Sequence, residues 1–221
     1  MAEVKSKDFV EIEYVGMIKD TGSVFDTNIE KVAKESAIGS KGHEFHPMVI
    51  CVGENHMLKG LEEQIVGKQV GKEYTFEVSH DKAFGKKDTK LIQLIPTSKF
   101  LKQKIQPAVG LQLNIDGVFG IIKTVSGGRC YVDFNHPLAG KDLTYKVKIN
   151  KIVTDDKEKL NALLHTHFHM HNPKIEITEG KAVVQADAKI PKEAQVEFSK
   201  MVSLSVPSIK EVTINEERKN K

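Results

Sequence analysis

The sequence contains no tryptophan, two cysteines, and aromatic residues at only 6% of the chain. Cys51 and Cys130 stand far apart in apolar segments. This spacing excludes a cysteine-based metal site and favours two small buried thiols in a reducing compartment. The chain also lacks an apolar run long enough to span a membrane, and its charged start, MAEVKSKDFVEIEY, lacks the apolar stretch of a signal peptide. We therefore expect a cytoplasmic protein with no membrane partner.

The sequence also lacks a large excess of charge of either sign. The formal net charge is +3 over 221 residues, of which 29% are charged and 39% hydrophobic. This mild balance indicates no nucleic-acid partner. The length allows one large domain or two to three small ones, each with a hydrophobic core.

The first part of the chain alternates between apolar and polar residues. Residues 10–18 follow this pattern, which predicts a half-buried strand. A turn is predicted at 20–22, and the strand that resumes over 24–26 carries Phe25 and Asp26. A carboxylate beside an aromatic ring is costly to bury unless it is hydrogen-bonded. Asp26 therefore either points to solvent or belongs to a site.

A short helix is predicted next. Leu58, Leu61 and Ile65 recur at spacings of three and four, with Asn55 as the predicted N-cap and Gly67 as the residue that ends the helix. The surrounding residues predict a loop over 28–46 and strands over 46–53 and 72–78. The first 85 residues thus favour an α+β fold, in which a curved antiparallel sheet wraps around one short helix.

Residues 86–142 predict several short strands with little room for a helix, so we expect a small all-β unit. Within it, LQLNIDGVFGIIKTV is typical of a hairpin, because Asp116-Gly117 is a strong tight-turn pair. Residues 143–149 alternate again as a strand.

The last part predicts a second α+β unit. Thr154 or Asp155 caps a helix, Asp155 with Glu158 fits a capping box, and Asn172-Pro173 ends the helix. The predicted elements that follow are strands over 175–177 and 182–186, a helix from Pro191, and a strand over 209–214.

Three segments together resemble the FKBP-type peptidyl-prolyl cis-trans isomerases. The first is YVGMIKDTGSVFDTN, similar to the family's Y-x-G-x-x-x-x-G-x-x-F-D-S. The second is PMVICVGENHMLKGLEEQIVGKQVGKEY, similar to the family's V-I-x-G-x-E helix entry and G-x-x-x-x-V-G exit with a glycine spacing that differs by one residue in each, and the third is DKAFG, similar to D-x-A-Y-G. Order and spacing also agree with the family over about residues 4–153.

The long excursion between Gly85 and Leu143 refines this resemblance. Typical members have a short flap there, whereas IQLIPTSKF and NHPLAGKDL in this excursion resemble the SlyD-like, insert-in-flap branch of bacteria and archaea. The residues after 153 resemble the extra domain of long archaeal members. The resemblance implies an isomerase domain over 1–86 and 142–153, an insert-in-flap chaperone domain over 87–141, and a C-terminal α+β domain over 154–221.

The resemblance also implies the lining of a proline pocket. Three positions depart from the best-known eukaryotic members: Met48 stands where Phe is usual, Leu61 where Trp forms the floor, and Phe84 where Tyr offers a hydroxyl. These changes put macrolide binding in doubt more than activity. The implied pocket residues are Tyr14, Phe25, Asp26, Met48, Met57, Leu58, Leu61, Phe84 and Tyr145.

An X-Pro bond isomerises slowly because rotation breaks amide resonance, with a barrier of roughly 18–20 kcal/mol. A dry cleft favours the twisted amide over the charge-separated planar one, so the reaction requires no cofactor. The resemblance implies that Asp26 faces the cleft and accepts a hydrogen bond from Tyr14, and that a backbone N–H near Leu58 holds the substrate carbonyl. The alternative is that Phe25 belongs to the core and Asp26 caps a surface turn.

Five apolar residues of the insert are predicted to be exposed and to bind unfolded chain. They either do so or fill a small β core. A chain-binding unit beside a catalytic cleft raises the effective concentration of weakly bound substrate. The predicted chaperone surface consists of Ile95, Phe100, Leu101, Phe134 and Leu138.

The stretch HTHFHMH suggests a different chemistry. Imidazoles are good ligands for nickel, zinc or copper, so His165, His167, His169 and His171 are candidate ligands of a divalent metal. Helical residues two apart point to nearly opposite sides, however. The alternative that we favour is therefore a solvated helix end, where cations are stabilised.

The predicted function is peptidyl-prolyl isomerisation with chaperone activity, and the partners are unfolded or partly folded polypeptides that contain proline. The alternative is a non-catalytic chaperone or metal carrier on the same scaffold. The C-terminal domain either rests on the isomerase or pairs a sheet edge with a second copy, and we lean towards a homodimer.

Overall fold

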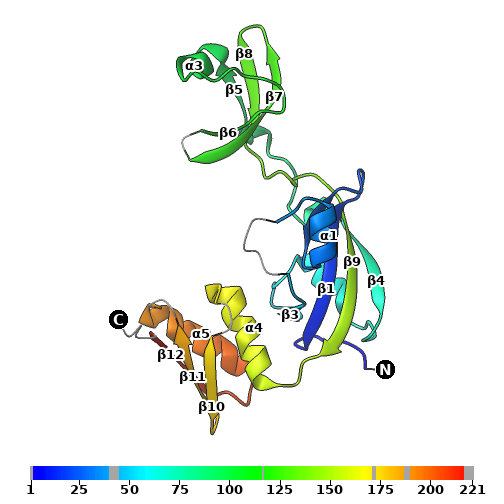
Figure 1. Ribbon diagram of the computed structural model, residues 1–221, viewed down its shortest axis with the longest axis vertical. Coiled ribbons are helices and arrows are strands. Elements are labelled where there is room, and N and C mark those ends of the chain that lie inside the picture. Colours follow the sequence, from blue (N-terminus) through cyan, green and yellow to red (C-terminus); the bar gives the residue numbers. More distant parts are fainter. Residues whose placement is uncertain (1, 40–44, 116, 171–172, 187–189, 217–221) are drawn as a thin grey trace. The chain divides into compact units, whose positions relative to one another are not determined.

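The computed structural model describes residues 2–39, 45–115, 117–170, 173–186 and 190–216. The chain divides into two compact units, one formed by Met1–Val78 with Leu143–Lys221 and the other by Ser79–Asp142 (Figure 1). The second unit is thus inserted between strands β4 (Glu73–Val78) and β9 (Leu143–Ile152) of the first. In the described part of the chain, no helix combines the length and the apolar character needed to cross a membrane.

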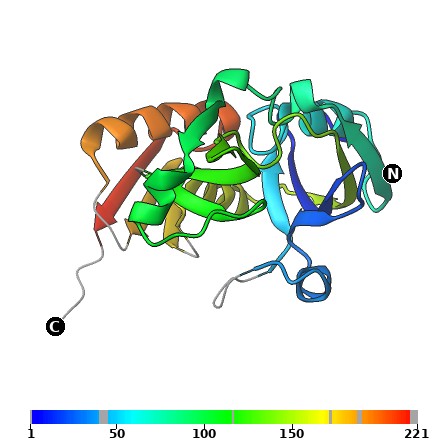
Figure 2. The same ribbon diagram turned by 90° about the horizontal axis from the view of Figure 1, so that it is seen from above.

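The N-terminal sheet is antiparallel, and its strand order is β2-β1-β9-β4 with β3 paired to β1. The long strand β1 (Phe9–Ile18) runs beside β9 along its length (Figures 1 and 2). Its burial alternates, with Ile12 and Tyr14 buried, so the predicted half-buried strand is confirmed. The remaining strands of this sheet are β2 (Val24–Thr27) and β3 (Met48–Cys51).

Helix α2 (Lys59–Ile65) contributes the fully buried Leu61 and Ile65. Gly67 follows the helix with φ +78°, as expected for the residue that ends it. The predicted N-cap is wrong, because Leu58 occupies that position and Asn55 lies in the left-handed region with φ +59°. Asn55 lies instead in the loop before the helix, and the backbone N–H groups of this loop donate hydrogen bonds to Glu62 of α2.

The predicted loop over 28–46 contains a short helix, α1 (Glu30–Glu35). Glu30 forms an ion pair with Lys34 at 2.6 Å, one turn along the helix, and Ala33 is fully buried. Such pairs stabilise a helix by about 0.2–0.5 kcal/mol each. The prediction took the polar composition as a loop signal and overlooked this charge spacing.

The C-terminal residues form a three-stranded sheet and two helices. Strand order is β10-β11-β12, with β10 antiparallel and β12 parallel to β11. The parallel pair is joined through α5 (Lys192–Ser205), which runs alongside β12 (Figure 2). The strands are β10 (Lys174–Thr178), β11 (Lys181–Ala186) and β12 (Glu211–Glu216).

Helix α4 (Asp156–Phe168) begins as predicted, because the Asp155 side chain accepts a hydrogen bond from the Glu158 N–H at 2.8 Å. Its predicted end at Asn172-Pro173 is wrong. The helix ends at Phe168, and His169 takes a left-handed conformation with φ +53°. The chain therefore leaves the helix before the proline can act as a stop.

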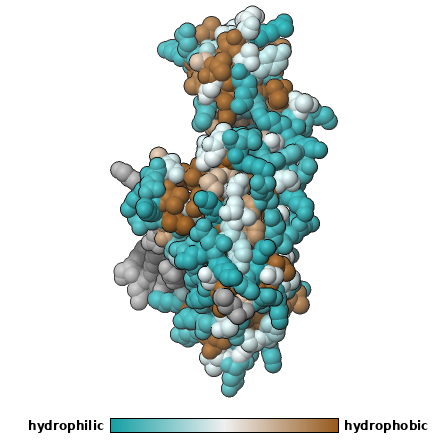
Figure 3. All heavy atoms as spheres, turned by 90° about the vertical axis from the view of Figure 1, so that its right-hand side faces the viewer, coloured by the Kyte–Doolittle hydropathy of each residue, from teal (hydrophilic) through white to brown (hydrophobic). Residues whose placement is uncertain are grey.

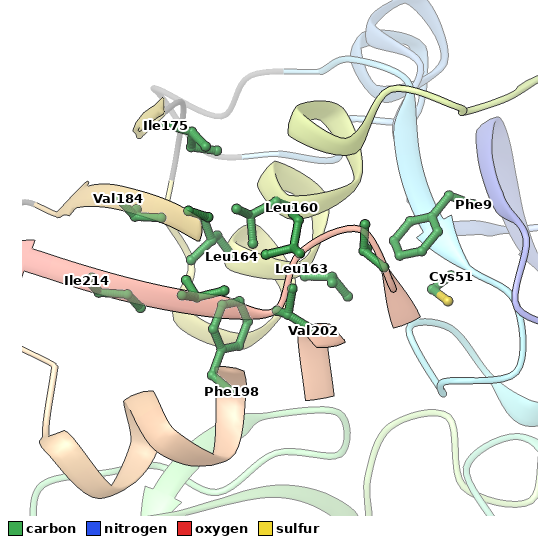
Figure 4. Packing of buried hydrophobic residues seen from close by; sticks show 14 of the residues in the cluster. Phe9, Cys51, Leu160, Leu163, Leu164, Ile175, Val184, Phe198, Val202 and Ile214 are labelled. Carbon is green, nitrogen blue, oxygen red and sulfur yellow. The ribbon is translucent and has the colours of Figure 1, made fainter. Parts of the chain in front are cut away.

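The largest described hydrophobic cluster of the first unit contains residues from both its N-terminal and its C-terminal segment. Phe9 and Cys51 of the N-terminal sheet pack in one cluster with Leu160, Leu163 and Leu164 of α4 (Figure 4). The cluster continues into the C-terminal sheet and α5, where Val184, Phe198, Val202 and Ile214 are buried. The three-domain division, with a boundary after 153, stays a prediction.

The inserted unit contains a four-stranded antiparallel sheet of order β5-β8-β7-β6. The predicted hairpin is confirmed by the pairing of Ile115 with Val118, although Asp116 lies outside the described residues. The expected all-β unit also contains a short helix, α3 (Thr97–Lys102), and the 3₁₀ turns η1 (His80–Lys82) and η2 (Thr89–Leu91). Its strands are β5 (Ile92–Pro96), β6 (Gln112–Ile115), β7 (Val118–Ser126) and β8 (Arg129–Asp133).

Candidate functional site

Asp26 lies on β2 and is partly buried. The Tyr14 hydroxyl on β1 donates a hydrogen bond to its Oδ2 at 3.0 Å, so the predicted hydrogen bond is confirmed. Burial, followed by the charge of Asp26, raises the pKa of Tyr14 above its ordinary value. The tyrosine therefore remains a neutral donor, and the carboxylate retains a partner away from bulk water.

The two residues after Asp26 fix the backbone of Tyr14. The Thr27 hydroxyl donates to the Tyr14 carbonyl at 2.7 Å, and Asn28 Oδ1 accepts from the Tyr14 N–H at 2.7 Å. Asn28 Nδ2 also donates to the carbonyl of Ile12 at 2.9 Å. Sequence reasoning did not single out Thr27 and Asn28. The only signal for them is a run of short polar side chains directly after a strand.

Gly16 allows aromatic rings to meet over β1. It pairs with Asp26 on one side and with Tyr145 of β9 on the other. A Cβ at this position would lie 2.9 Å from Phe25 Cζ and 3.1 Å from Tyr145 Cε1. The Phe25 and Tyr145 rings instead form an edge-on pair with centroids 5.9 Å apart. The bare glycine backbone is thus what lets these two rings approach.

Tyr145 completes the aromatic group. Its ring centroid lies 6.1 Å from that of Tyr14. Burial, and then the charge of Asp26, raise its pKa. Four predicted residues, Tyr14, Phe25, Asp26 and Tyr145, therefore come together on three adjacent strands.

The loop between β3 and α2 carries Met57 and Leu58, both half-buried. Its backbone is held by Glu62 of α2, which is only 3% exposed. One carboxylate oxygen accepts from the N–H groups of Gly53 at 2.8 Å and Asn55 at 3.1 Å, and the other accepts from Met57 at 2.7 Å. Sequence reasoning missed Glu62, because a Glu beside other charged residues on a helix is usually exposed to solvent.

The other predicted pocket residues lie in different settings. Met48 on β3 is half-buried and pairs with Ile12, while Leu61 is fully buried. Phe84 belongs to the inserted unit, where its ring stacks on His136 with centroids 4.4 Å apart and planes 4° from parallel. His136 Nδ1 accepts from the Leu138 N–H at 3.2 Å, which holds the imidazole in place.

Hydrogen bonds join the two segments that connect the inserted unit to β4 and β9. The backbone N–H and Nδ1 of His80 lie 2.8 and 2.7 Å from Asp142 Oδ1. Lys87 reaches Asp133 at 2.8 Å, and Asn135 donates to the same carboxylate from its backbone and side chain. Burial alone would raise the pKa of Asp133, but these hydrogen bonds and the Lys87 charge lower it to about 2.

The predicted chaperone surface of the insert is only partly exposed. Phe100 and Leu138 are buried, so the prediction of exposure is wrong for both. Ile95 and Phe134 are half-buried against the small core of Phe100, Ile122, Cys130 and Val132, while Leu101 is 55% exposed. Phe100 lies on the short helix α3 and Leu138 in a turn, where the alternation of a strand gives no guide to burial.

Other apolar side chains are exposed on the inserted unit. Leu94 pairs directly with Tyr131, so both project from the sheet face opposite the buried Cys130 and Val132. By the same register, Ile92 and Phe119 share that face. We call these four residues, which are 37–48% exposed, the outer face. Figure 3 shows apolar groups at the surface of this unit, at the top of the view.

The histidine-rich stretch does not gather at one point. His165 lies edge-on to His46 with ring centroids 6.4 Å apart, and His167 lies edge-on to His56 at 6.1 Å. His169 follows the helix, and His171 lies outside the described residues. Among the described residues, no group of three or more His, Cys, Asp or Glu side chains is placed to hold a metal ion. The metal site stays a prediction.

Both cysteines are buried free thiols, as predicted. Burial, as the largest cause, raises the pKa of Cys51 to about 11, so this thiol is not a poised nucleophile. The described chemistry around Asp26 is thus that of a partly desolvated carboxylate, its tyrosine donor and a set of rings. Such a group can orient and polarise a bound amide.

Comparison with known proteins gives two family matches. Residues 1–106 match the family described as FKBP-type peptidyl-prolyl cis-trans isomerase, and residues 93–138 match the family described as FKBP26, IF domain.

Individual relatives agree with these families. A short-type peptidyl-prolyl cis-trans isomerase of Methanocaldococcus jannaschii is 34% identical over 155 residues, which cover 70% of this chain and 98% of the relative. The FKBP-type 16 kDa peptidyl-prolyl cis-trans isomerase of Escherichia coli is 32% identical over 111 residues, covering 48% and 74%. The SlyD isomerase of Helicobacter pylori is 25% identical over 157 residues, covering 70% and 77%.

Proposed function

The chain belongs to the FKBP-type peptidyl-prolyl cis-trans isomerases, and we propose that its catalytic site is the group of residues around Asp26. The observation that carries this proposal is the Tyr14–Asp26 hydrogen bond beside the Phe25 and Tyr145 rings. It places one charge at the edge of an apolar, aromatic surface. The proposed pocket is completed by Met48, Met57, Leu58 and Leu61.

The proposed mechanism is differential binding of the twisted amide. The planar X-Pro amide is charge-separated, and twisting reduces that separation as resonance is lost. An apolar surface therefore disfavours the ground state more than the transition state. Asp26 orients and polarises the bound imide without taking a proton, and Tyr14, whose pKa is raised, keeps its proton and holds the carboxylate.

The test measures kcat/KM for a short X-Pro peptide with Asp26→Ala, Asp26→Asn and Tyr14→Phe. Asp26→Ala should lower kcat/KM about tenfold or more, equivalent to at least about 1.4 kcal/mol of transition-state stabilisation. Asp26→Asn keeps an acceptor for Tyr14 and removes only the charge, so it separates the two roles. A folded Asp26→Ala protein with full activity would refute the proposed site.

We further propose that the inserted unit binds unfolded chain through its outer face, together with Leu101. Exposed apolar groups on a small sheet suit weak, adaptable contacts with an extended polypeptide. A chain held there is presented to the isomerase at raised effective concentration. The substrates would be unfolded or partly folded polypeptides that contain proline.

This chaperone proposal is tested with two substrates. A Leu94→Ser/Tyr131→Ser variant should keep kcat/KM for a short peptide but accelerate the proline-limited refolding of an unfolded protein about tenfold less than wild type. Val109→Ser removes an apolar residue that is more exposed than either of these and lies outside the outer face, and it serves as the control. Equal effects on both substrates would contradict the proposal that the insert binds unfolded chain while the site around Asp26 catalyses isomerisation.

A homodimer through the C-terminal residues remains a proposal, and the hydrogen bonds favour one sheet edge for it. The N–H groups of Val212 and Ile214 on β12 donate to Ser199 Oγ at 2.9 Å and Gln195 Oε1 at 3.3 Å. Because α5 thus covers the β12 edge, pairing with a second copy would use β10. Light scattering of wild type and an Ile177→Pro variant tests this, since proline would block pairing at β10.

A further inference from the structure

His56 occupies the loop between β3 and α2, directly before Met57. Its Nδ1 accepts a hydrogen bond from the Cys51 N–H at 3.2 Å. The neutral ring therefore carries its proton on Nε2. That Nε2 is buried and has no hydrogen-bond partner within the described residues. A buried donor without a partner persists only where the surrounding packing fixes its position.

The side chain that packs against His56 comes from the C-terminal half of the chain. The His167 ring of α4 lies nearly perpendicular to the His56 ring, with centroids 6.1 Å apart and planes at 80°. The His167 ring also meets the Phe198 ring of α5 edge-on, with centroids 5.9 Å apart. His167 is itself exposed, and its ring contacts both the His56 ring of the loop and the Phe198 ring of a core helix.

The two elements behind His167 are firmly anchored. Leu160, Leu163 and Leu164 of α4 and Phe198 of α5 lie in the cluster that also contains Phe9 and Cys51 (Figure 4). Cys51 supplies the N–H that His56 accepts. The same buried cluster therefore contains Cys51, whose N–H orients the His56 ring, and the residues that anchor α4 and α5.

The loop itself is irregular and needs support from outside. Asn55 holds a left-handed conformation, which a residue other than glycine adopts at some cost. Glu62 fixes the loop amides from the α2 side. The His56 side chain accepts a hydrogen bond from the Cys51 N–H, and the ring of His167 packs edge-on to it from the C-terminal half.

We propose that His167 is a positioning residue for the isomerase reaction, because its contact with His56 holds the loop that presents Met57 and Leu58. This inference rests on the proposed place of these two residues in the proline pocket. It assigns the C-terminal half a part in shaping the site, in addition to any role in assembly. His167 acts through His56 and touches no substrate.

The experiment compares His167→Ala, His167→Phe and the control His165→Ala with wild type in the full chain, each measured with and without a chelator. His165 lies on the same helix and faces His46 instead. We expect His167→Ala to lower kcat/KM for a short X-Pro peptide about three- to tenfold, within the range of couplings transmitted through packed side chains. His167→Phe keeps an edge-on ring and should recover most of the activity, whereas His165→Ala should match wild type.

Two further readouts separate positioning from general destabilisation. Amide hydrogen exchange at Asn55 and Met57 should speed up in His167→Ala and not in His165→Ala, at equal global stability. In a double-mutant cycle, His56→Ala with His167→Ala should be no worse than the more damaging single variant. If His167→Ala does not fold, His167→Leu, which keeps most of the side-chain volume, makes the same comparison.

Several outcomes would overturn the proposal. Activity and exchange that match His165→Ala would show that the contact does not hold the loop, and additive losses would show that the two rings act separately. Equal losses in His165→Ala and His167→Ala that a chelator reproduces in wild type would point to metal binding. Leu58→Ala is the reference for the pocket. If Leu58→Ala retains full activity, the proposed pocket is refuted. If Leu58→Ala loses activity and His167→Ala does not, only the positioning role of His167 is refuted.

Discussion

The sharpest test of the site's construction is the substitution Glu62→Gln, which is nearly isosteric. The carboxylate of Glu62 receives the N–H groups of Gly53 and Asn55 on one oxygen and that of Met57 on the other. A glutamine offers one acceptor oxygen and one NH₂ group. Whichever way the amide turns, its NH₂ faces at least one backbone donor, and the charge is lost.

The structure sets the size of the effect. Hydrogen bonds to charged groups contribute about 1.5–3 kcal/mol each, and a buried donor without an acceptor costs about 1–3 kcal/mol. The glutamine oxygen can keep the Gly53 and Asn55 bonds in weakened form, while the Met57 N–H loses its acceptor. We therefore expect the free energy of unfolding to fall by about 2–4 kcal/mol. Because the strain falls on the loop with Met57 and Leu58, kcat/KM should fall too.

Urea denaturation measures the stability loss, and peptide isomerisation measures the activity. Glu63→Gln is the matched control, because Glu63 follows Glu62 on the same helix and is exposed; its free energy of unfolding should change by less than about 0.5 kcal/mol. Amide exchange at Gly53, Asn55 and Met57 should speed up only in Glu62→Gln. If the two variants proved equally stable, the three hydrogen bonds would contribute nothing net, and the reasoning would be refuted.

Three further predictions concern the strands and the insert. Gly16→Ala should lower kcat/KM for an X-Pro peptide about tenfold, because its Cβ would lie 2.9 Å from Phe25 Cζ; an unchanged rate would show that the ring has room to move. Thr27→Val should lower the free energy of unfolding by about 1–2 kcal/mol in urea denaturation, because the Tyr14 carbonyl loses its hydroxyl donor and the Ile29 N–H loses its acceptor, whereas Thr27→Ser should not. Because the pKa of Asp133 is about 2 in the fold and about 3.9 in unfolded chain, its stabilisation is present above pH 4 and lost as pH falls towards 2. Lys87→Met should therefore raise the acid-unfolding midpoint of the insert, followed by NMR, and Lys86→Met should not.

The regular elements could be predicted because their cause is local. Strand β1 alternates apolar and polar residues, and one face of it is buried as that period requires. The cap of α4 at Asp155 is a contact between residues three apart, so it too is visible in sequence. The Tyr14–Asp26 bond was expected only because the family resemblance paired them; twelve residues and a turn separate the partners.

The contacts that hold the site together leave no such periodic signal. Glu62 bonds backbone groups five to nine residues earlier, and Thr27 and Asn28 bond the backbone of Tyr14 across a strand pair. The sequence gives the type of each side chain, but it does not show which backbone N–H groups lie close to that side chain in the folded protein. For the same reason Asn55, whose side-chain type suits a cap, was predicted as the N-cap of the helix, and the role of Glu62 in holding the loop was missed.

The insert shows the limit of apolar composition as a guide. Phe100 and Leu138 were predicted as surface residues and are buried, while Ile92 and Phe119 were not singled out and are exposed. Phe100 lies on a short helix and Leu138 in a turn, so strand alternation does not describe them. Ile92 and Phe119 lie on short strands, where a shift of one residue exchanges the two faces of the sheet. Only the pairing register, such as Leu94 with Tyr131, decides which face is which.

These contacts explain how a reaction that requires no strong acid, base or nucleophile still requires a well-built site. An apolar surface discriminates between planar and twisted amides only if its side chains stay in place, since a surface that adapts to the planar form stabilises the ground state equally. Apolar contacts alone are non-directional. Rigidity must come from directional contacts behind the surface, and that is where Glu62, Thr27 and Asn28 bond the backbone. Disrupting these contacts should therefore reduce catalysis even though none of the three is proposed to touch the substrate.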